Sequence, residues 1–387
     1  MSPAATLPSV ADLRLAGRRV FIRADLNVPL KDGAVADDSR IRASLETLDF
    51  VRRAGGRVVL ASHLGRPKAA PDPKYSLAPV ARQMGLPLAP DCVGPETESR
   101  VAALRNGEAI LLENLRFHAG EEANDPAFVA KLAQLCDVYV NDAFGTAHRA
   151  HASTEGLALV CSDVGAGFLL LREVAALSRV RDAPEHPYVC ILGGAKVSDK
   201  LAVLESLAAR ADTVAIGGAM AYTFLLAKGE PVGRSRVERD LVDTAKRLLA
   251  GKTEILLPVD HVVAASPDDE AGARTVERIP DDAMGLDIGP RSRAALAERV
   301  ARAKTVFWNG PLGFFEKPPF DAGTHAVAEL LAASPAYSVV GGGDSLAAVQ
   351  ASGVADRIRH LSTGGGASLE FLEGRALPGV EALRRRG

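Results

Sequence analysis

The strongest constraint on the fold is a regular alternation that runs through the whole chain. Short runs of β-branched and other apolar residues, such as RVVLASHL (57–64) and TVFWN (305–309), end in glycine or polar residues and give way to helical patterns. Strands that alternate with helices form parallel sheets with helices on both faces. The sequence therefore predicts an α/β fold built of doubly wound parallel sheets.

The length of 387 residues is more than a single hydrophobic core usually supports. Charge and two prolines follow a helical stretch at RVRDAPEHP (179–187), and we place a domain junction there. The helix after Gly167 and segment 179–187 are the candidate hinge elements. Within the first domain, Ile41, Leu45, Leu48 and Val51 are predicted to share one helical face.

Composition excludes several classes of protein. A net charge of −2 gives no overall attraction to nucleic acid or to an anionic membrane. The stretch 1–19 lacks a basic start followed by an apolar segment, and no apolar run approaches the roughly 18 residues of a membrane helix. We therefore expect a cytoplasmic protein. Neither a zinc site nor a disulfide framework is suggested by the cysteines, which are widely spaced and form no C-x-x-C pair: Cys92, Cys136, Cys161 and Cys190.

In the first half of the chain, the predicted strands end in polar and cationic residues. The carboxyl ends of parallel strands meet at one edge of a sheet, where ligands of open α/β sheets bind. Several guanidinium groups there would suit a small substrate with more than one negative charge. The alternative is that these are solvated surface arginines. The residues at these strand ends are Arg23, Asp25, Asn27, His63, Arg66, Arg116, His148, Arg149 and His151.

In the second half, the strand ends are rich in glycine. Bare backbone and helix N-termini suit a large planar or phosphorylated ligand, and a nucleotide fits best. In GGAKVSDK (193–200), Ser198 is predicted to cap a helix that carries Lys200 in its first turn. That lysine would be unfavourable against the helix dipole unless an anion lay between them. A solvated lysine at a helix start remains the alternative.

The stretch YSVVGGGDSLAAV (337–349) combines a strand, a glycine turn and a helix. Such a turn forms an anion site, yet this one carries Asp344 and no lysine. An acid beside a phosphate site makes sense chiefly when a metal ion lies between them. The sequence therefore predicts that Asp344 holds a metal.

Familiar nucleotide motifs are otherwise missing. The GKT at 251–253 lacks the earlier glycine of a Walker A loop and is predicted to be a helix-ending turn. No G-x-G-x-x-G is found, which weakens the alternative of a nicotinamide-dependent dehydrogenase. A non-catalytic anion-binding protein would explain the arginines but not a separate glycine-rich half with Asp344 and Glu316.

Eight segments, in order along nearly the whole chain, resemble the phosphoglycerate kinase family. They are RADLNVP, SHLGRP, LLENLRFHAGEE, NDAFGTAHRAHAS, GGAKVSDK, WNGPLGFFE, GGGDS and STGGGASLEFLEG. The resemblance implies an enzyme that transfers a phosphoryl group reversibly between 1,3-bisphosphoglycerate and ADP, giving 3-phosphoglycerate and ATP. It implies a domain for the phosphoglycerates (1–178), a nucleotide domain (179–366) and a C-terminal segment that returns to the first domain (367–387). A monomer that uses Mg²⁺, with no nucleic-acid or membrane partner, is expected.

The resemblance also implies roles for particular residues. Arg40, Lys196, Lys200 and Gly365 are expected near the transferring phosphoryl group, and Asp344 at the metal. The phosphoglycerate-binding residues would be Asp25, Asn27, Arg40, His63, Leu64, Gly65, Arg66, Arg116 and Arg149. The nucleotide-binding residues would be Lys200, Gly217, Gly218, Gly285, Leu286, Glu316, Gly342, Gly343, Asp344 and Ser345. The family commonly has threonine at the position of Ser345 and a third glycine at that of Ala219.

Catalysis of this kind needs no general base, because the attacking group is already an anion. Phosphoryl transfer depends mostly on alignment and on stabilising charge. Water must be excluded while the acyl phosphate reacts, so closure of the two domains is expected.

Overall fold

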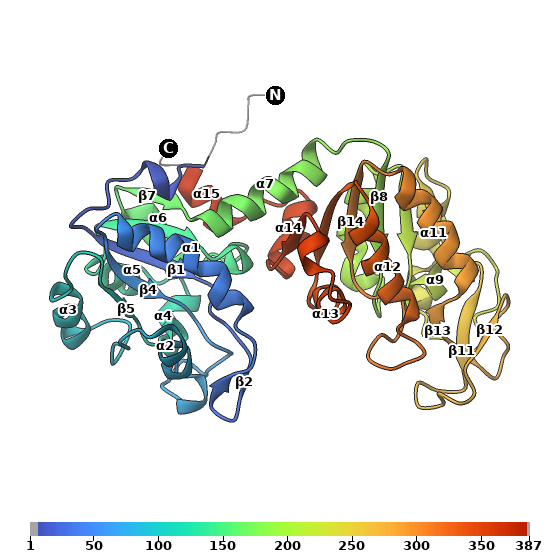
Figure 1. Cartoon of the computed structure of the whole chain (residues 1–387), viewed down its shortest axis with the longest axis horizontal. Coiled ribbons are helices and arrows are strands. Elements are labelled where there is room, and N and C mark those ends of the chain that lie inside the picture. Colours follow the sequence, from blue (N-terminus) through green and yellow to red (C-terminus); the bar gives the residue numbers. More distant parts are fainter. Residues whose placement is uncertain (1–6, 385–387) are drawn as a thin grey trace. The chain divides into compact units, whose positions relative to one another are not determined.

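The computed structural model describes residues 7–384. The chain divides into two compact units, and the division falls inside helix α7 (Phe168–Asp182). Unit 1 comprises Met1–Ala175 and Ala376–Gly387, and unit 2 comprises Ala176–Arg375. Figure 1 shows both units coloured along the chain.

Unit 1 is built on a five-stranded sheet in the order β5-β4-β1-β6-β7, and all four of its strand pairs are parallel. The chain moves outward from β1 through β4 to β5 and then returns to β6 on the other side. The strand order therefore reverses between β1 and β6, which is where open α/β sheets bind ligands. The strands are β1 (Arg19–Ala24), β4 (Arg57–Ala61), β5 (Ala109–Leu111), β6 (Val138–Asp142) and β7 (Val164–Ala166).

The remaining elements of unit 1 surround this sheet. They are the hairpin β2 (Leu30–Lys31) and β3 (Ala34–Val35), and the helices α1 (Ser39–Arg53), α2 (Ala78–Met84), α3 (Pro95–Ala102), α4 (Ala119–Glu122), α5 (Pro126–Ala133), α6 (Leu157–Val160) and α15 (Pro378–Arg384). Short 3₁₀ turns are η1 (Val10–Asp12), η2 (Pro73–Tyr75), η3 (Leu115–Phe117) and η4 (Phe144–Thr146), and η5 (Ala152–Gly156) is a π-helical turn.

Unit 2 repeats the doubly wound plan with six strands in the order β10-β9-β8-β14-β15-β16, all parallel. Its order reverses between β8 and β14. The strands are β8 (Tyr188–Leu192), β9 (Thr213–Ile216), β10 (Glu254–Leu256), β14 (Thr305–Asn309), β15 (Tyr337–Gly341) and β16 (His360–Ser362). A separate antiparallel sheet contains β11 (His261–Ala264), β12 (Arg274–Val276) and β13 (Met284–Ile288).

The helices of unit 2 are α8 (Leu201–Ala208), α9 (Met220–Ala227), α10 (Val242–Leu249), α11 (Pro290–Arg302), α12 (Ala322–Ala333), α13 (Gly343–Ala351) and α14 (Gly366–Leu372). Its 3₁₀ turns are η6 (Ser198–Lys200), η7 (Arg239–Leu241) and η8 (Ala355–Arg357). The predicted turn at 251–253 is confirmed, because α10 ends at Leu249 and the amide of Gly251 closes back on the carbonyl of Leu248. Together the two sheets confirm the predicted fold class.

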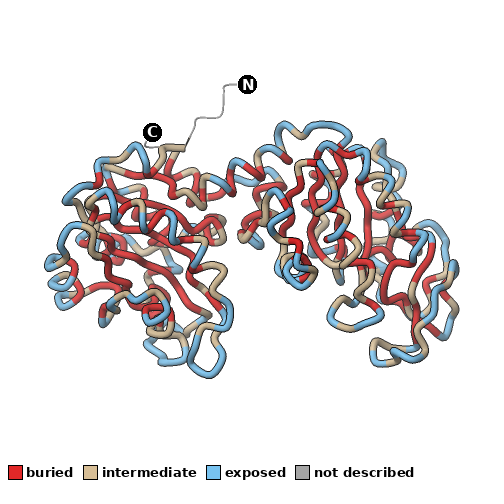
Figure 2. Tube along the Cα trace, viewed as in Figure 1, coloured by how far each residue is buried: buried red, intermediate tan, exposed pale blue. Residues whose placement is uncertain are grey.

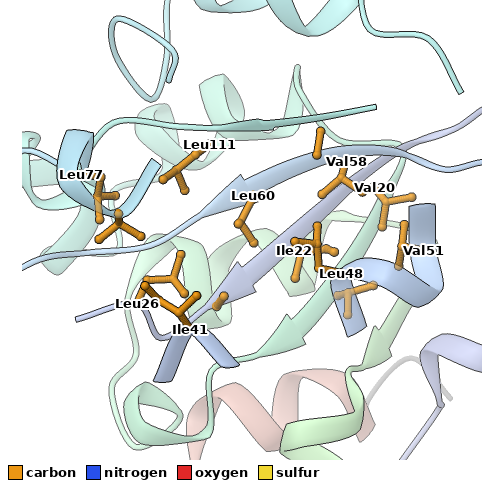
Figure 3. Close-up of a cluster of buried hydrophobic side chains, with 14 of the residues drawn as sticks. Val20, Ile22, Leu26, Ile41, Leu48, Val51, Val58, Leu60, Leu77 and Leu111 are labelled. Carbon is orange, nitrogen blue, oxygen red and sulfur yellow. The ribbon is translucent and has the colours of Figure 1, made fainter. Parts of the chain in front are cut away.

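The core of each unit lies against its parallel sheet. Both faces of β1 are buried, as expected for parallel strands covered on both sides. Figure 3 shows Ile22 and Leu60 of neighbouring strands packed with Leu48 of α1. Figure 2 shows the same pattern in both units, with buried strands inside exposed helix surfaces and loops. The rigid sheets fix the positions of the loops at the strand ends.

One detail of the helix prediction is wrong. Leu45 is 36% exposed and lies at the edge of the α1 face, while Ser44 and Thr47 are buried. Thr47 Oγ1 accepts a hydrogen bond of 2.9 Å from the amide of Phe168, so the buried face of α1 includes polar side chains. A pattern that counts only apolar residues could not identify Ser44 and Thr47 as buried positions.

No helix in the described part of the chain is long and apolar enough to cross a bilayer.

Candidate functional site

At the carboxyl edge of the unit 1 sheet, positive charges converge on His63. This side chain follows β4 and is only 3% exposed. Burial lowers the pKa of His63 well below its usual value, and the charges of Arg23, Arg116, Arg149 and Arg40 lower it further. The imidazole is therefore neutral at pH 7. The positive charges of four guanidinium groups act together on the position of His63. A field of this sign favours an anionic ligand.

Arg23 is a buried member of this cluster, because its side chain is only 1% exposed. Its Nε donates to Ser153 Oγ (2.8 Å), and its Nη2 lies 3.2 Å from His63 Nδ1. Ser153 Oγ in turn donates to the buried carboxyl group of Glu121 (2.6 Å). Arg23 was noted only as a strand-end residue, and neither Ser153 nor Glu121 was predicted. Both lie inside segments that carry the family resemblance, which was the available signal.

Backbone groups join the loops around this cluster. Gly65 N donates to Asn27 Oδ1 (2.8 Å), and Gly65 O accepts from Arg116 Nη1 (2.9 Å). Gly65 has φ +61°, and a Cβ there would lie 2.4 Å from the ring of Tyr75. Glycine is therefore required at this position for both backbone and packing reasons. The predicted residues Asn27, Gly65 and Arg116 are brought together by these bonds.

Asp25 orients a second arginine. Its carboxylate forms an ion pair of 2.7 Å with Arg40, whose side chain is 34% exposed. The guanidinium is thus held by a largely buried acid and keeps access to solvent.

The loop after β6 carries Arg149 and two histidines. Arg149 is half-buried, and its Nε lies 3.3 Å from His148 Nε2. Burial, followed by the charges of neighbouring arginines, also lowers the pKa of His151 to about 4.

Not every predicted residue belongs to the charged cluster. Leu64 is buried, whereas Arg66 is exposed. Asn27, Leu64 and Gly65 instead line a pocket of about 410 Å³, whose other lining residues are mostly apolar or aromatic but include Lys74. The cluster and this pocket share the loops that follow β1 and β4.

In unit 2, Lys200 lies where the strand order reverses. Its Nζ donates to the carbonyl oxygen of Gly193 (2.6 Å), the residue after β8. It also donates to the carbonyl oxygen of Asn309 (2.9 Å), the last residue of β14. Burial lowers the pKa of Lys200 to about 8, although the nearby carboxylate of Asp344 raises it. The ammonium group is thus largely buried, and the negative charge of Asp344 favours its protonated form.

The predicted cap by Ser198 is wrong. Helix α8 begins at Leu201, and its N-cap position is Lys200, which makes no side-chain cap. Ser198 Oγ donates instead to Glu238 Oε1 (2.6 Å), while Glu238 Oε2 accepts from the amides of Val197 (2.5 Å) and Ser198 (3.1 Å). A carboxylate from a distant segment therefore satisfies these amides. Such a long-range acceptor cannot be identified from local sequence.

The glycines after β9 are packed against the protein's own chain. A Cβ on Gly217 would lie 2.5 Å from Leu312, and one on Gly218 would lie 2.6 Å from the backbone nitrogen of Gly194. Gly218 also has φ +65°. Gly217 lines a small, largely apolar pocket with Leu256 and Leu312. These glycines let the loops of β8, β9 and β14 come together.

The turn after β15 is more open. Gly342, the N-cap residue of α13, has φ +93°, and a Cβ on Gly343 would meet nothing within 4 Å. Asp344 is exposed in the first turn, and no described residue forms a hydrogen bond with its side chain. Ser345 is fully buried, and its Oγ accepts from the amide of Gly310 (2.6 Å). Its hydroxyl therefore supports the neighbouring loop, and the expected contact of Ser345 with a nucleotide stays a prediction.

The other predicted residues of unit 2 lie in separate surroundings. Gly285 and Leu286 belong to β13, and Gly285 N donates to Ser235 Oγ (2.9 Å). Among the described residues, neither lines the small pocket beside Gly217. Lys196 and Glu316 are exposed, and so is Gly365, which precedes α14 with φ +54°.

These two sites define a class of protein: a two-unit α/β protein with a cationic binding site on one sheet and a glycine-rich, acid-bearing site on the other. A family model described as phosphoglycerate kinase matches residues 10–375. The chain is 54% identical over 391 residues to the phosphoglycerate kinase of Anaeromyxobacter dehalogenans (strain 2CP-C), covering 97% of this chain and 99% of that one. The chain therefore belongs to the phosphoglycerate kinase family.

Solved structures agree with this assignment. The structure of phosphoglycerate kinase from Coxiella burnetii matches with a TM-score of 0.91 and 41% identity, covering 98% of this chain and 99% of that one. Phosphoglycerate kinase from Pyrococcus horikoshii OT3 matches with a TM-score of 0.86 and 34% identity, covering 98% and 100%.

Proposed function

We propose that this chain transfers a phosphoryl group reversibly between 1,3-bisphosphoglycerate and ADP, giving 3-phosphoglycerate and ATP. The observation that carries the proposal is the division of chemistry between the units. Four arginine charges act on one sheet edge in unit 1. In unit 2, Lys200 and Asp344 lie close enough to interact beside glycine turns. A non-catalytic anion binder would not need the second site, and a nicotinamide-dependent dehydrogenase would be expected to carry the G-x-G-x-x-G motif, which this sequence lacks.

Unit 1 binds the phosphoglycerate in this proposal. Arginine forks grip phosphate and carboxylate oxygens bidentately, and the buried network around Arg23 fixes the loops that present them. Neutral His63 can donate or accept one hydrogen bond without adding charge. The contacting residues are Asp25, Asn27, Arg40, His63, Leu64, Gly65, Arg66, Arg116 and Arg149.

Unit 2 binds the nucleotide. The exposed amides at the start of α13 suit phosphate oxygens, because the first N–H groups of a helix lack partners within it. Lys200 is a cation already held at the sheet edge, so a phosphate there gains a charged partner. The contacting residues are Lys200, Gly217, Gly218, Gly285, Leu286, Glu316, Gly342, Gly343, Asp344 and Ser345.

The surroundings of Asp344 fit a magnesium ion. The exposed side chain supplies carboxylate oxygens, the ligands that Mg²⁺ prefers, and it needs only one such protein ligand when nucleotide phosphates supply others. Asp344 would hold the ion. When bound, Mg²⁺ would neutralise charge on the nucleotide phosphates.

The chain's own residues contribute alignment and positive charge. Arg40, Lys196 and Lys200 stabilise the charge on the group in transfer, and the backbone at Gly365 adds donors. No proton needs to be removed from the attacking oxygen, because the phosphate or carboxylate is already ionised. Acyl phosphates hydrolyse, so water must be kept out during transfer. Helix α7 and segment 179–187 carry the chain between the units and are the proposed hinge.

We further propose that the chain acts as a monomer in the cytoplasm, without nucleic-acid or membrane partners. The net charge of −2 supports the absence of a general attraction to polyanions.

The test is an assay of the purified chain with 3-phosphoglycerate and MgATP, in which hydroxylamine traps the acyl phosphate as a hydroxamate. Hydroxamate should form only when both substrates and Mg²⁺ are present. A folded chain that forms none would overturn the proposed function. NAD⁺-dependent absorbance changes with the same substrate would favour the dehydrogenase alternative instead.

A further inference from the structure

Two cysteines that are distant in sequence lie together in unit 1. Cys136 precedes β6 and Cys161 follows α6, and their Sγ atoms are 3.3 Å apart. All four cysteines are reduced in this structure. The sulfur atoms of a disulfide are about 2.05 Å apart, so a shift of little more than 1 Å would bring this pair to bonding distance.

The register of the parallel sheet explains why the two thiols meet. Strand β6 pairs with β7 so that Tyr139 lies beside Val164 and Val140 beside Gly165. Counting back equally from Tyr139 and Val164 reaches Cys136 and Cys161. The two cysteines therefore lie at the N-terminal ends of β6 and β7, whereas the cationic cluster lies at the carboxyl ends of the strands.

Arginines on β1 and just before it hold the same two segments. Arg18 forms an ion pair with Asp163 (2.5 Å) and donates to the carbonyl of Asp137 (2.6 Å). Arg19 pairs with the carboxylate of Asp137 (2.5 Å). These bonds tie the residue after Cys136 to the segment of Cys161. The approach of the two sulfurs is thus supported by the surrounding fold and does not depend on the thiols alone.

We propose that Cys136 and Cys161 form a site of reversible oxidation, at which a small disulfide such as oxidised glutathione produces an intramolecular disulfide. The thiolate of Cys136 attacks a sulfur of the small disulfide, forming a mixed disulfide and releasing one thiol. Cys161 then attacks Cys136 Sγ and releases the second thiol. Two protein thiols lose two electrons and two protons, and one small disulfide becomes two thiols.

The surroundings favour a slow reaction that begins at Cys136. Cys136 is partly exposed, whereas Cys161 is 7% exposed. The hydrogen bond with Cys161, together with burial, raises the pKa of the Cys136 thiol well above its usual value. Little thiolate is present at neutral pH, so oxidation should take hours and should be reversed by an excess of thiol.

The experiment uses the full chain, incubated with oxidised glutathione and then alkylated under denaturing, non-reducing conditions. Trypsin cleaves after Arg149, which separates a peptide of residues 132–149 from one of residues 150–172. Mass spectrometry should find these two peptides joined, and joined no longer after reduction. Cys136→Ser and Cys161→Ser should each abolish the joined product, whereas Cys92→Ser should retain it.

The melting temperature provides a second readout. The oxidised wild type should melt at a higher temperature than the reduced protein, because the cross-link restricts the unfolded chain and the native positions need little change. Cys136→Ser should show no such increase after the same treatment. Full alkylation of both thiols in wild type that has been incubated with oxidised glutathione would overturn the proposal. An unchanged or lowered melting temperature of the bridged protein would contradict the claim that the fold already positions the two sulfurs.

Discussion

Lys200 is a lysine whose ammonium is held by two strand-end carbonyls while burial makes its charge costly. Burial lowers its pKa to about 8 from a reference of 10.5. Bound phosphates favour the charged form, so nucleotide binding should take up a proton at and above pH 8. ADP affinity should accordingly fall as the pH rises through 8.

Calorimetric titration of ADP between pH 7 and 9.5, in buffers of different ionisation enthalpy, would measure this proton uptake. In Lys200→Met the affinity should be lower and the proton uptake near pH 8 should vanish. The free wild type should also gain stability relative to this variant as the pH rises from 8 toward 10.5, because only the unfolded chain still holds the proton. Identical proton uptake in both proteins would remove Lys200 from the site.

Asp344→Asn preserves the size of the side chain but removes the charge expected to hold Mg²⁺. Activity should fall by two orders of magnitude or more at about 1 mM Mg²⁺, and excess Mg²⁺ should recover part of it. The exposed position predicts a melting temperature within about 1 °C of wild type. Steady-state rates over a range of Mg²⁺ concentrations provide the measurement. A wild-type dependence on Mg²⁺ would show that Asp344 only shapes the turn.

At the level of elements, the glycines of unit 2 serve two purposes that a matched pair of variants can separate. Gly218→Ala should destabilise the protein by about 2 kcal/mol or more, since the methyl group meets backbone at a positive φ. Gly343→Ala should leave stability unchanged or raise it by up to about 1 kcal/mol, because the space is open. Denaturant unfolding gives both values.

The same pair distinguishes folding from binding. Gly343→Ala should weaken ADP binding despite its intact fold, if phosphates approach the start of α13. Normal ADP affinity in Gly343→Ala would mean that the nucleotide does not approach this turn closely.

Ser345 links the turn after β15 to the turn after β14. Ser345→Ala leaves the buried amide of Gly310 without its acceptor and should cost about 1 to 3 kcal/mol of unfolding free energy. Ser345→Thr keeps the acceptor and should lose less. Thermal unfolding of the two variants tests the role. Equal stability of the alanine and threonine variants would contradict it.

The sequence predicted the elements better than the contacts between them. Strand ends were predictable because β-branched runs stop at glycine or polar residues, and the parallel sheets then bring Arg23, His63, Arg116 and Arg149 to one edge. The cap by Ser198 was predicted wrongly, because Glu238 arrives from far along the chain. The position of Leu45 was missed because a buried threonine, not an apolar residue, completes the α1 face.

For the whole molecule, the order of the strands carries information that no short segment contains. Lys200 lies between β8 and β14 only because the chain winds outward from β8 and returns beside it. The proximity of Cys136 and Cys161 depends in the same way on the register of β6 and β7. Local patterns describe each strand, whereas pairing decides which strand ends become neighbours.

The division of substrates between the units is the central claim, and calorimetric titration of two variants tests it most directly. Arg149→Ala and Asp344→Asn would each be titrated with 3-phosphoglycerate alone and with MgADP alone, beside wild type. Arg149→Ala should lose at least about tenfold in affinity for 3-phosphoglycerate, since a charged hydrogen bond contributes about 1.5 to 3 kcal/mol, and should bind MgADP normally. Asp344→Asn should lose affinity for MgADP and bind 3-phosphoglycerate as wild type does. Equal losses for both ligands in either folded variant, or none in both, would contradict the account.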